Sequence, residues 1–354
     1  MKYVALKDVC KINMGQSPDS SSYNENGEGI PFFQGNADFG ERHPVTRVWC
    51  NAPTKIAQSE DILISVRAPI GALNYAKEKC CIGRGLAAIT PDKSKVSLEF
   101  VYWFLKGKNA ELKSKGTGST FKAISKKILE EILIPDVGFD KQHEYAQMLE
   151  KIYVIIQTRK QELQKLDELI QSRFAEMFGD PIMNPKGWKV LTIGNIVTEV
   201  RYGTSKPAVE GGKYPYLRMN NLTADGHLDL NDLKYIDISD DEVEKCVVRK
   251  GDVLFNRTNS IDLVGKTAVF DLPDDMVIAG YIIRVRLNEK ILPEVLSQYM
   301  NLEALKDILR SMAKGAVNQA NINAQELQSI RVYVPDIELQ KQFVEMKDQV
   351  DKSK

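Results

Sequence analysis

Metal-binding and disulfide patterns are absent from this 354-residue sequence. Its five cysteines, Cys10, Cys50, Cys80, Cys81 and Cys246, are an odd number without any C-x-x-C pair, so neither a disulfide framework nor a zinc site is indicated. The three histidines stand far apart along the chain. We therefore expect reduced, mostly buried thiols and no metal site.

Long apolar runs are also missing. No run approaches the ~20 residues needed to span a bilayer, and the N-terminus lacks the apolar stretch of a signal peptide. We expect a cytoplasmic protein. The 43% apolar and 27% charged residues are typical of globular domains. The length suits two domains of about 150 residues with connecting elements.

Catalytic signatures are missing as well. The sequence has no Walker loop, G-x-S-x-G or H-E-x-x-H motif, and no F-x-G-x-G or N-P-P-F-like motif of an adenine methyltransferase. A nuclease-like P-D and E-x-K arrangement is matched only loosely, by Pro335-Asp336 and Glu345-Met346-Lys347, where apolar spacing predicts a helix. We expect no catalytic residue and no cofactor in this chain.

The net charge is zero, which argues against a strongly basic nucleic-acid binder, but the charges are unevenly distributed. Residues 1–137 carry 19 Lys and Arg against 15 Asp and Glu, whereas residues 181–335 carry 19 against 20. Any nucleic-acid contact in the second region must therefore come from local clustering of basic side chains.

One long helix with a coiled-coil stripe is predicted from Asp140 to Phe178. This stretch has no Pro or Gly, and Gly179-Asp180-Pro181 supplies a stop. At 1.5 Å per residue it would be a rod of roughly 58 Å. Its predicted seam consists of Leu149, Ile152, Ile156, Leu163, Leu166, Ile170 and Met177. Such a seam needs a second helix to cover it.

The chain contains an internal repeat. Ile134-Pro135-Asp136 is followed by Lys141-Gln142, and 200 residues later Val334-Pro335-Asp336 is followed by Lys341-Gln342 and a second apolar helical stripe. The strand-like run Glu60 to Arg67 is matched by Gly251 to Arg257. The helical segment Ser97 to Lys115 is similarly matched by Pro293 to Met312. These matches predict two domains of similar fold.

Each predicted domain ends in a polar loop before its helix. Lys115 to Ile124 is basic and rich in hydroxyls, and Lys314 to Ile322 has amides in the same place. Such loops present donors to phosphate oxygens, while Asn and Gln can bond adenine edges and Arg or Lys guanine edges. A solvated loop is the simpler reading of either segment alone, but its occurrence before both helices favours a function.

The order of domain, long helix, domain and second helix resembles the specificity (S) subunit of type I restriction-modification systems. The resemblance depends on Trp188 to Leu191 after Gly179-Asp180-Pro181, on Lys115 to Lys122, and on the two Pro-Asp helix starts. It implies two pseudo-repeated α/β (α+β) target recognition domains joined by a long coiled-coil helix. The expected segments are 1–137 for the first domain, 138–180 for the central helix, 181–335 for the second domain and 336–354 for a truncated distal helix.

The resemblance further implies a non-catalytic DNA-recognition subunit in which each domain reads half of a bipartite site. Double-stranded DNA and two methyltransferase (M) subunits are the implied partners, restriction (R) subunits are a further partner that the family allows, and S-adenosylmethionine belongs to a partner. Two alternatives stay open: a coiled-coil scaffold without base specificity, and a specificity partner of a methyltransferase that lacks a nuclease.

Eighteen polar side chains are candidates for DNA contact. The first-domain candidates are Gln34, Asn36, Arg67, Arg84, Lys115, Ser119, Thr120 and Lys122. The second-domain candidates are Arg218, Asn220, Asn221, Arg257, Asn259, Lys266, Lys314, Asn318, Gln319 and Asn321. For Arg67, Arg84 and Arg257, an ion pair that supports a turn is an equally good reading.

Overall fold

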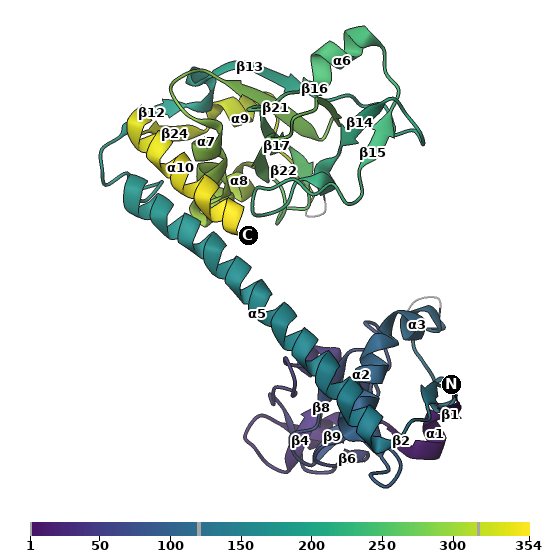
Figure 1. Cartoon of the computed structure of the whole chain (residues 1–354). Coiled ribbons are helices and arrows are strands. Elements are labelled where there is room, and N and C mark those ends of the chain that lie inside the picture. The colour runs from purple at the N-terminus through teal and green to yellow at the C-terminus, as the bar shows by residue number, and fades with distance from the viewer. Residues whose placement is uncertain (1, 119–121, 317–318) are drawn as a thin grey trace. The chain divides into compact units, whose positions relative to one another are not determined.

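The computed structural model describes residues 2–118, 122–316 and 319–354 (Figure 1). Contacts divide it into two units, Met1–Arg159 and Lys160–Lys354, and the boundary falls inside one long helix, α5 (Phe139–Phe178). No helix in the described ranges combines the length and the apolar character that a bilayer span requires.

The first unit contains two small sheets and a strand pair. One sheet is antiparallel with the order β2-β10-β7-β8, and the other has the order β3-β5-β4-β9-β6, in which β4 and β9 are parallel. The strands are β1 (Tyr3–Ala5), β2 (Cys10–Met14), β3 (Tyr23–Asn24), β4 (Ile30–Phe33), β5 (Trp49–Cys50), β6 (Ile56–Ala57), β7 (Ile62–Ser65), β8 (Leu73–Tyr75), β9 (Cys80–Ile82), β10 (Leu86–Pro91) and β11 (Leu133–Pro135). The helices are α1 (Leu6–Val9), α2 (Leu98–Gly107), α3 (Asn109–Ser114) and α4 (Lys126–Glu130), with 3-10 turns η1 (Ser20–Ser22) and η2 (Asn36–Asp38).

The second unit repeats this plan. Its two main sheets have the orders β13-β21-β17-β19 and β15-β14-β20-β16, in which β14 and β20 are parallel, and β12 pairs with β24 as β1 pairs with β11. The second unit adds a three-stranded sheet of order β18-β23-β22. The strands are β12 (Lys189–Thr192), β13 (Val197–Tyr202), β14 (Tyr214–Leu217), β15 (Lys234–Ile236), β16 (Val247–Val248), β17 (Val253–Asn256), β18 (Thr258–Asn259), β19 (Thr267–Val269), β20 (Met276–Ile278), β21 (Ile282–Leu287), β22 (Lys314–Ala316), β23 (Gln319–Asn321) and β24 (Arg331–Val334). The helices are α6 (Asp240–Cys246), α7 (Pro293–Asn301), α8 (Glu303–Met312), α9 (Ala324–Ser329) and α10 (Ile337–Ser353), with 3-10 turns η3 (Ile193–Asn195) and η4 (Met219–Asn221).

Equivalent strands divide their side chains between two cores in both units. In β7, Ile62 and Ile64 enter one hydrophobic core while Leu63 enters another, because successive side chains of a strand point to opposite faces. In β17, Phe255 and Leu254 are divided in the same way. The predicted duplication and the mixed α/β content are therefore confirmed.

In each unit, a buried glutamine near the start of a helix, α5 or α10, bonds the backbone of the preceding segments. Gln142 donates from Nε2 to the Val137 carbonyl at 2.8 Å, and its Oε1 accepts from Ser97 N–H at 2.8 Å. Gln340 does the same with the Pro335 carbonyl and Leu292 N–H, also at 2.8 Å each.

This shared arrangement corrects the register of the predicted repeat. Because Gln142 and Gln340 make the same bonds, they are the equivalent pair, 198 residues apart. The match of Lys141-Gln142 with Lys341-Gln342, 200 residues apart, was therefore wrong by two residues. Gln342 is exposed on the outer face of α10 and has no such role.

The predicted long helix is confirmed as α5, and Gly179 ends it with a φ of +84°. The packed stripe agrees with the predicted seam only in part. Leu149, Ile152 and Ile156 are exposed, whereas Ile170 of the seam is buried and Met177 of the seam packs against the same core. Phe174 and Phe178 are also buried and lie four residues apart, outside the predicted a/d positions. The coiled-coil pairing stays a prediction for residues 149–166.

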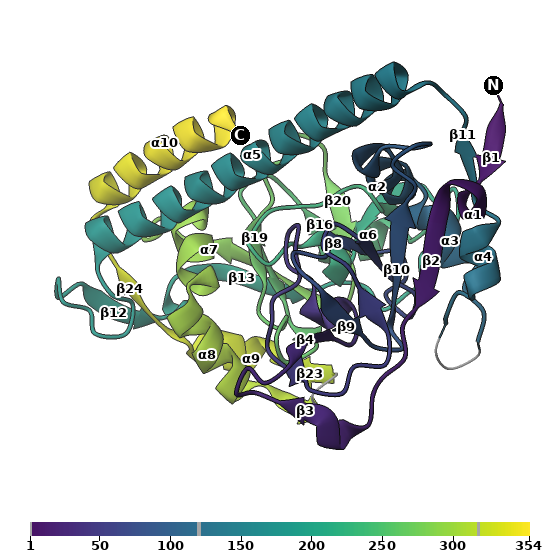
Figure 2. The same cartoon turned by 90° about the horizontal axis from the view of Figure 1, so that it is seen from below.

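Helix α10 covers the C-terminal part of α5 and runs beside it in both views (Figures 1 and 2). The Phe343 ring lies 5.2 Å from the Phe174 ring and 5.5 Å from the Phe178 ring, with edge-to-face geometry. Further toward the end of α10, Lys354 Nζ lies 2.7 Å from Asp167 Oδ1. The two helices are therefore antiparallel where they touch.

The N-terminal part of α5 is held differently. The Arg42 guanidinium carbon lies 4.6 Å from the centroid of the Tyr153 ring and 5.3 Å from that of Trp103. The same arginine pairs with Glu150 of α5. Lys106 Nζ lies 3.9 Å from the Tyr153 ring centroid. Cation–π contacts and an ion pair thus attach α5 to the first domain.

Candidate nucleic-acid interface

Four predicted residues of the first domain meet at neighbouring strand ends. Gln34 follows β4, Arg67 follows the β7 region, Arg84 lies between β9 and β10, and Lys122 precedes the segment that returns to α4; all four are exposed. Backbone bonds join their segments, since Gly85 N–H donates to the Gln34 carbonyl at 3.1 Å and Ala68 N–H to the Lys122 carbonyl at 3.2 Å. The result is a basic and amide-bearing cluster on the surface.

Glycine makes the close approach of these segments possible. A Cβ on Gly85 would lie 2.4 Å from the Gln34 carbonyl oxygen, a distance that would force the backbone apart. The Gly83-Arg84-Gly85 turn therefore keeps Arg84 beside Gln34. The pattern of an arginine between two glycines is visible in the sequence, but its partner strand is not.

Other candidates in the first domain have local roles. Lys115 Nζ lies 2.7 Å from Glu111 Oε1, and hydrogen bonds from Lys108 and Lys115 lower the pKa of Glu111 to about 2. The positive charge of Lys115 is therefore already partly compensated by Glu111. Asn36 begins η2 and is half-buried. Ser119 and Thr120 lie outside the described residues.

In the second domain, Arg257 is held by several neighbours. Its Nη2 donates to Asn321 Oδ1 at 3.0 Å, its Nη1 donates to the Gly280 carbonyl at 3.4 Å, and its Cζ lies 5.0 Å from the Tyr202 ring centroid. Asn321 Nδ2 donates to Thr258 Oγ1 at 2.8 Å, which turns its amide oxygen toward the arginine. The guanidinium plane is thus fixed before any ligand binds.

Arg257 lines a cavity of about 510 Å³. Arg218 and Asn220 of the predicted set also line it, together with Tyr281, whose side chain is 50% exposed. Arg218 Nη2 lies 2.8 Å from Asp232 Oδ2, and hydrogen bonds from Lys234 and Arg218 lower the pKa of Asp232. The cavity therefore has two arginines whose positions are set by side-chain partners.

Two predicted contacts are overturned because the side chains are buried. Lys266 is 7% exposed and its Nζ donates to the Met219 carbonyl at 2.8 Å and to the Leu222 carbonyl, and burial lowers its pKa. Asn221 is 2% exposed; its Oδ1 accepts from Arg218 N–H and its Nδ2 donates to the Asp229 carbonyl. Both side chains support the loop around η4 instead of facing a ligand.

The remaining second-domain candidates differ in availability. Asn259 is half-buried and donates from Nδ2 to Asn256 Oδ1 at 2.9 Å. Lys314 Nζ lies 2.5 Å from Glu326 Oε1, and Gln319 is exposed on β23. Asn318 lies outside the described residues. Asn321 accepts from Arg257 and donates to Thr258, so its side-chain amide is already bonded within the protein.

Sequence reasoning missed Tyr202 and Tyr281. Tyr202 ends β13, and its hydroxyl accepts from Ala324 N–H at 2.7 Å, which fixes the ring under Arg257. Exposed aromatic residues next to glycine, as in Tyr202-Gly203 and Gly280-Tyr281, were the available signal. Aromatic rings near basic side chains are common in nucleic-acid sites.

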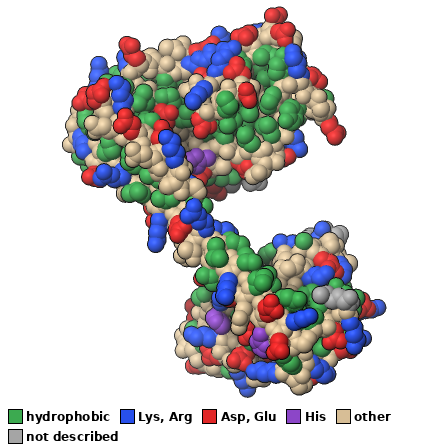
Figure 3. Space-filling view, viewed as in Figure 1, with side chains coloured by type: hydrophobic (Ala, Val, Ile, Leu, Met, Phe, Trp, Pro, Cys, Tyr) green, Lys and Arg blue, Asp and Glu red, His purple; other side chains and the backbone are tan. Residues whose placement is uncertain are grey.

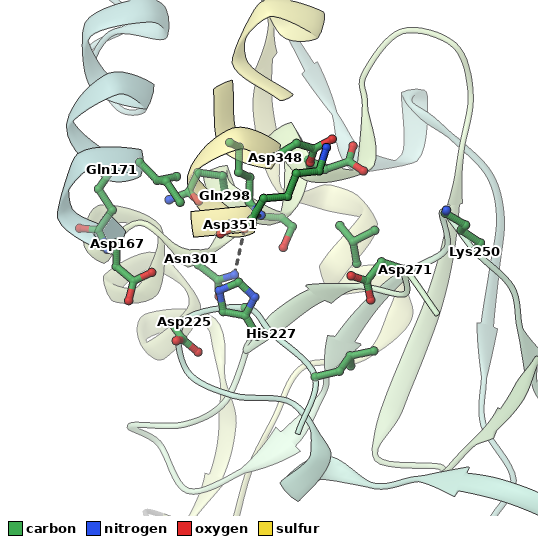
Figure 4. A pocket seen from close by; sticks show the side chains of 18 residues that line it. Asp167, Gln171, Asp225, His227, Lys250, Asp271, Gln298, Asn301, Asp348 and Asp351 are labelled. Carbon is green, nitrogen blue, oxygen red and sulfur yellow. Dashed lines mark hydrogen bonds and ion pairs between the residues drawn. The ribbon is translucent and has the colours of Figure 1, made fainter. Parts of the chain in front are cut away.

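A second cavity of the same unit, of about 520 Å³, has the opposite character (Figure 4). Six carboxylates line it against three lysines: Asp167, Asp225, Asp271, Glu294, Asp348 and Asp351 against Lys250, Lys347 and Lys352. This excess of negative charge disfavours phosphate, so the cavity is not part of the candidate interface. Over the described ranges, no group of three or more His, Cys, Asp or Glu side chains could hold a metal ion.

The fold and these clusters define a duplicated α/β protein in which each domain presents basic and amide side chains at strand ends. The sequence model described as "Type I restriction modification DNA specificity domain" matches residues 1–168 and again 185–354. The chain belongs to this family.

Individual relatives agree with this assignment. The MjaX specificity subunit of Methanocaldococcus jannaschii, named as part of a type I restriction enzyme, is 46% identical over 158 residues, which are 45% of this chain and 37% of that protein. The type I restriction enzyme EcoKI specificity subunit of Escherichia coli is 24% identical over 316 residues, 82% of this chain and 68% of that protein. The crystal structure of a type I S subunit from M. genitalium aligns over 99% of this chain and 89% of that one, with a TM-score of 0.56 and 16% identity, and shows the same fold.

Proposed function

We propose that this chain is the DNA sequence-recognition subunit of a type I restriction-modification complex and performs no chemistry itself. The observation that carries the proposal is the double match of the specificity-domain family to two domains that share one four-stranded sheet of equivalent strand order, β2-β10-β7-β8 and β13-β21-β17-β19. In this proposal, each domain reads one half of a bipartite site through its strand-end cluster. Segments 1–137 and 181–335 are the readers, and segments 138–180 and 336–354 are the helices.

The long helix would act as the spacer between the readers and as a docking surface for methyltransferase subunits. An exposed apolar stripe on α5 supports the docking role. Its members Leu149, Ile152 and Ile156 are 41 to 47% exposed, and Ile155 is 67% exposed. Figure 3 shows hydrophobic side chains gathered over the middle of α5 on the face in view. Clustered apolar exposure of this kind commonly marks a protein interface. The methyl donor, S-adenosylmethionine, would then be bound by these partners.

Competition binding tests base specificity. The chain, copurified with its methyltransferase subunits, is given labelled DNA selected from a random double-stranded pool and then an excess of unselected DNA in moderate salt. We expect the selected DNA to stay bound, because purely electrostatic contact weakens steeply with salt. A coiled-coil scaffold without base specificity would release both DNAs alike, and that result would refute the proposal.

The surface cluster of the first domain offers a companion measurement. Arg67→Ala, Arg84→Ala and Lys122→Ala each remove one exposed positive charge. A side chain that contacts only phosphate should weaken all sequences alike and reduce the salt slope by about 1, whereas a base contact should relax one position. If none of the three variants changes affinity, salt slope or sequence preference, the cluster is not part of the interface.

A further inference from the structure

The two domains place different residues at equivalent backbone positions beside the candidate interface. In the first domain, Val66 N–H donates to the Gly85 carbonyl and Ile124 N–H donates to the Val66 carbonyl, both at 2.9 Å. In the second, Arg257 N–H donates to the Tyr281 carbonyl and Ile322 N–H to the Arg257 carbonyl, again at 2.9 Å. Arg257 therefore occupies the position of Val66, and Tyr281 that of Gly85.

The same comparison extends to the residues around the arginine. Gly15 and Gly203 N–H donate to the carbonyls of Leu86 and Ile282 at equivalent points of paired strands. Tyr202 thus stands where the first domain has Met14. Asn321, the residue before Ile322, stands where it has Ala123. Four apolar or small residues in one domain correspond to two tyrosines, an arginine and an asparagine in the other.

The fold therefore does not require this polar cluster. Val66 is 2% exposed, so a buried valine fills this position in the first domain. An arginine in that position costs burial of polar atoms, and its Nε has no hydrogen-bond partner among the described residues. A residue kept at such a cost, and held in place by its own supporting side chains, points to a ligand.

Resting on the proposed function, we propose that Arg257 reads a guanine in the half-site of the second domain, with Asn321 and Tyr202 as its positioning residues. Each terminal nitrogen of the guanidinium has two N–H groups and uses one within the protein. One donor on each nitrogen remains, and a paired donor set matches the N7 and O6 acceptors of guanine in the major groove.

A base is favoured over a phosphate by the rest of the cavity. Apolar surface around the arginine comes from Pro207, Ala208, Met219, Ala279, Tyr216 and Tyr281. Lys206 and Arg218 also line the cavity, but each is already paired with a carboxylate, Lys206 with Glu242 and Arg218 with Asp232. A phosphate needs charge and gains little from such a lining, whereas the edge or face of a base gains from both. The first domain has no arginine at this position and would not read its half-site in this way.

The test is selection of double-stranded DNA from a random pool by the full chain with its methyltransferase subunits, followed by sequencing. For the unmodified chain we expect one position of one half-site to be guanine. Arg257→Lys keeps the charge but loses the fork, so it should reduce the guanine preference there roughly tenfold to hundredfold and leave other positions unchanged. Asn321→Ala should reduce the same preference by a smaller factor.

Two further variants separate folding from readout. Arg257→Val installs the residue that the equivalent strand end accommodates, so it should fold and lose the same preference. Arg310→Lys alters an arginine of α8 that pairs with Glu303 and Asp307, and it should leave the preference intact.

The possible outcomes are distinct. Selection of no preferred sequence by the unmodified chain would refute the proposed function itself. If the unmodified chain selected a specific sequence and both the Arg257→Lys and Arg257→Val variants retained every base preference, only the assignment of Arg257 would be overturned. If Arg257→Val weakened the affinity for all DNA sequences equally and Arg257→Lys did not change it, Arg257 would be a phosphate contact. That result would also overturn its assignment as a guanine reader.

Discussion

The two domains share a four-stranded sheet of equivalent order but differ in where they place positive charge. In the first, Arg67, Arg84 and Lys122 are exposed, and no ion pair links them to a described residue. In the second, the described residues include three buried cations, Lys266, Lys306 and Arg284. Duplication thus conserved the backbone while each copy acquired its own polar chemistry, as two domains that read different half-sites would need.

The attachment of α5 shows the same divergence. The first domain holds it with Arg42 between aromatic rings, and the second with a cluster of Phe174, Phe178 and Phe343. Cation–π contacts at partly exposed sites contribute about 0.5 to 2 kcal/mol, whereas a buried phenylalanine contributes several. The second attachment should therefore be the stronger one.

Phe174→Ala tests this difference and should have the largest effect. Phe174 is fully buried, so the substitution should lower the unfolding free energy of the second unit by about 3 to 5 kcal/mol. Guanidinium denaturation followed by hydrogen exchange in peptides of each unit would measure it. Ile152→Ala, at a 47% exposed position of the same helix, serves as the control and should change little. Equal losses for the two variants would contradict the observed packing.

Substitution of the buried glutamines tests whether the units are truly equivalent. Gln142→Met and Gln340→Met should each lower the stability of their own unit by about 1 to 3 kcal/mol, because buried N–H and carbonyl groups lose their partners. Gln342→Met, at the position that the apparent sequence repeat equates with Gln142, should have almost no effect. A loss for Gln342→Met as large as that for Gln340→Met would restore the 200-residue register.

These residues also show what a sequence can and cannot predict. The apolar run of β7, the matching run of β17 and the length of α5 depend on local periodicity, and the sequence predicts all three. The equivalence of Gln142 and Gln340 depends on which side-chain amide is buried, and the sequence does not show this. The chance repeat of a Pro-Asp pair 200 residues apart suggested a different alignment.

The candidate site was predictable only in part for the same reason. Arginines near strand ends can be found by pattern, but Arg257 is positioned by Asn321, 64 residues away along the chain. The pattern also could not distinguish buried Lys266 from exposed Lys122, because burial is set by tertiary packing. Composition and spacing therefore indicate which segments are candidates for DNA contact. Contacts between distant segments determine which of their side chains are exposed to a ligand.

The buried cations give the smallest expected effect, a difference in pH dependence. Burial lowers the pKa of Lys306 to about 8, from an ordinary value near 10.5. Between these pH values the unfolded chain binds more protons at this site than the folded one, so the stability of the second unit should rise with pH. Below pH 8 both states are protonated and the contribution becomes constant. Between pH 8 and 9 the expected gain is about 1 kcal/mol.

Lys306→Met should remove most of this gain, because the variant has no titrating group at this position. The first unit serves as a less sensitive reference, because its Lys106, whose pKa burial also lowers, is only half-buried, whereas Lys306 is buried. Its Cys10 and Cys80 have pKa values raised to about 12 by burial, so above pH 9 its stability should fall as the unfolded thiols ionise. Denaturation curves at pH 7, 8 and 9 would therefore show a larger rise for the second unit than for the first. If the stability of the Lys306→Met variant rose equally with pH, the rise would come from another titrating group.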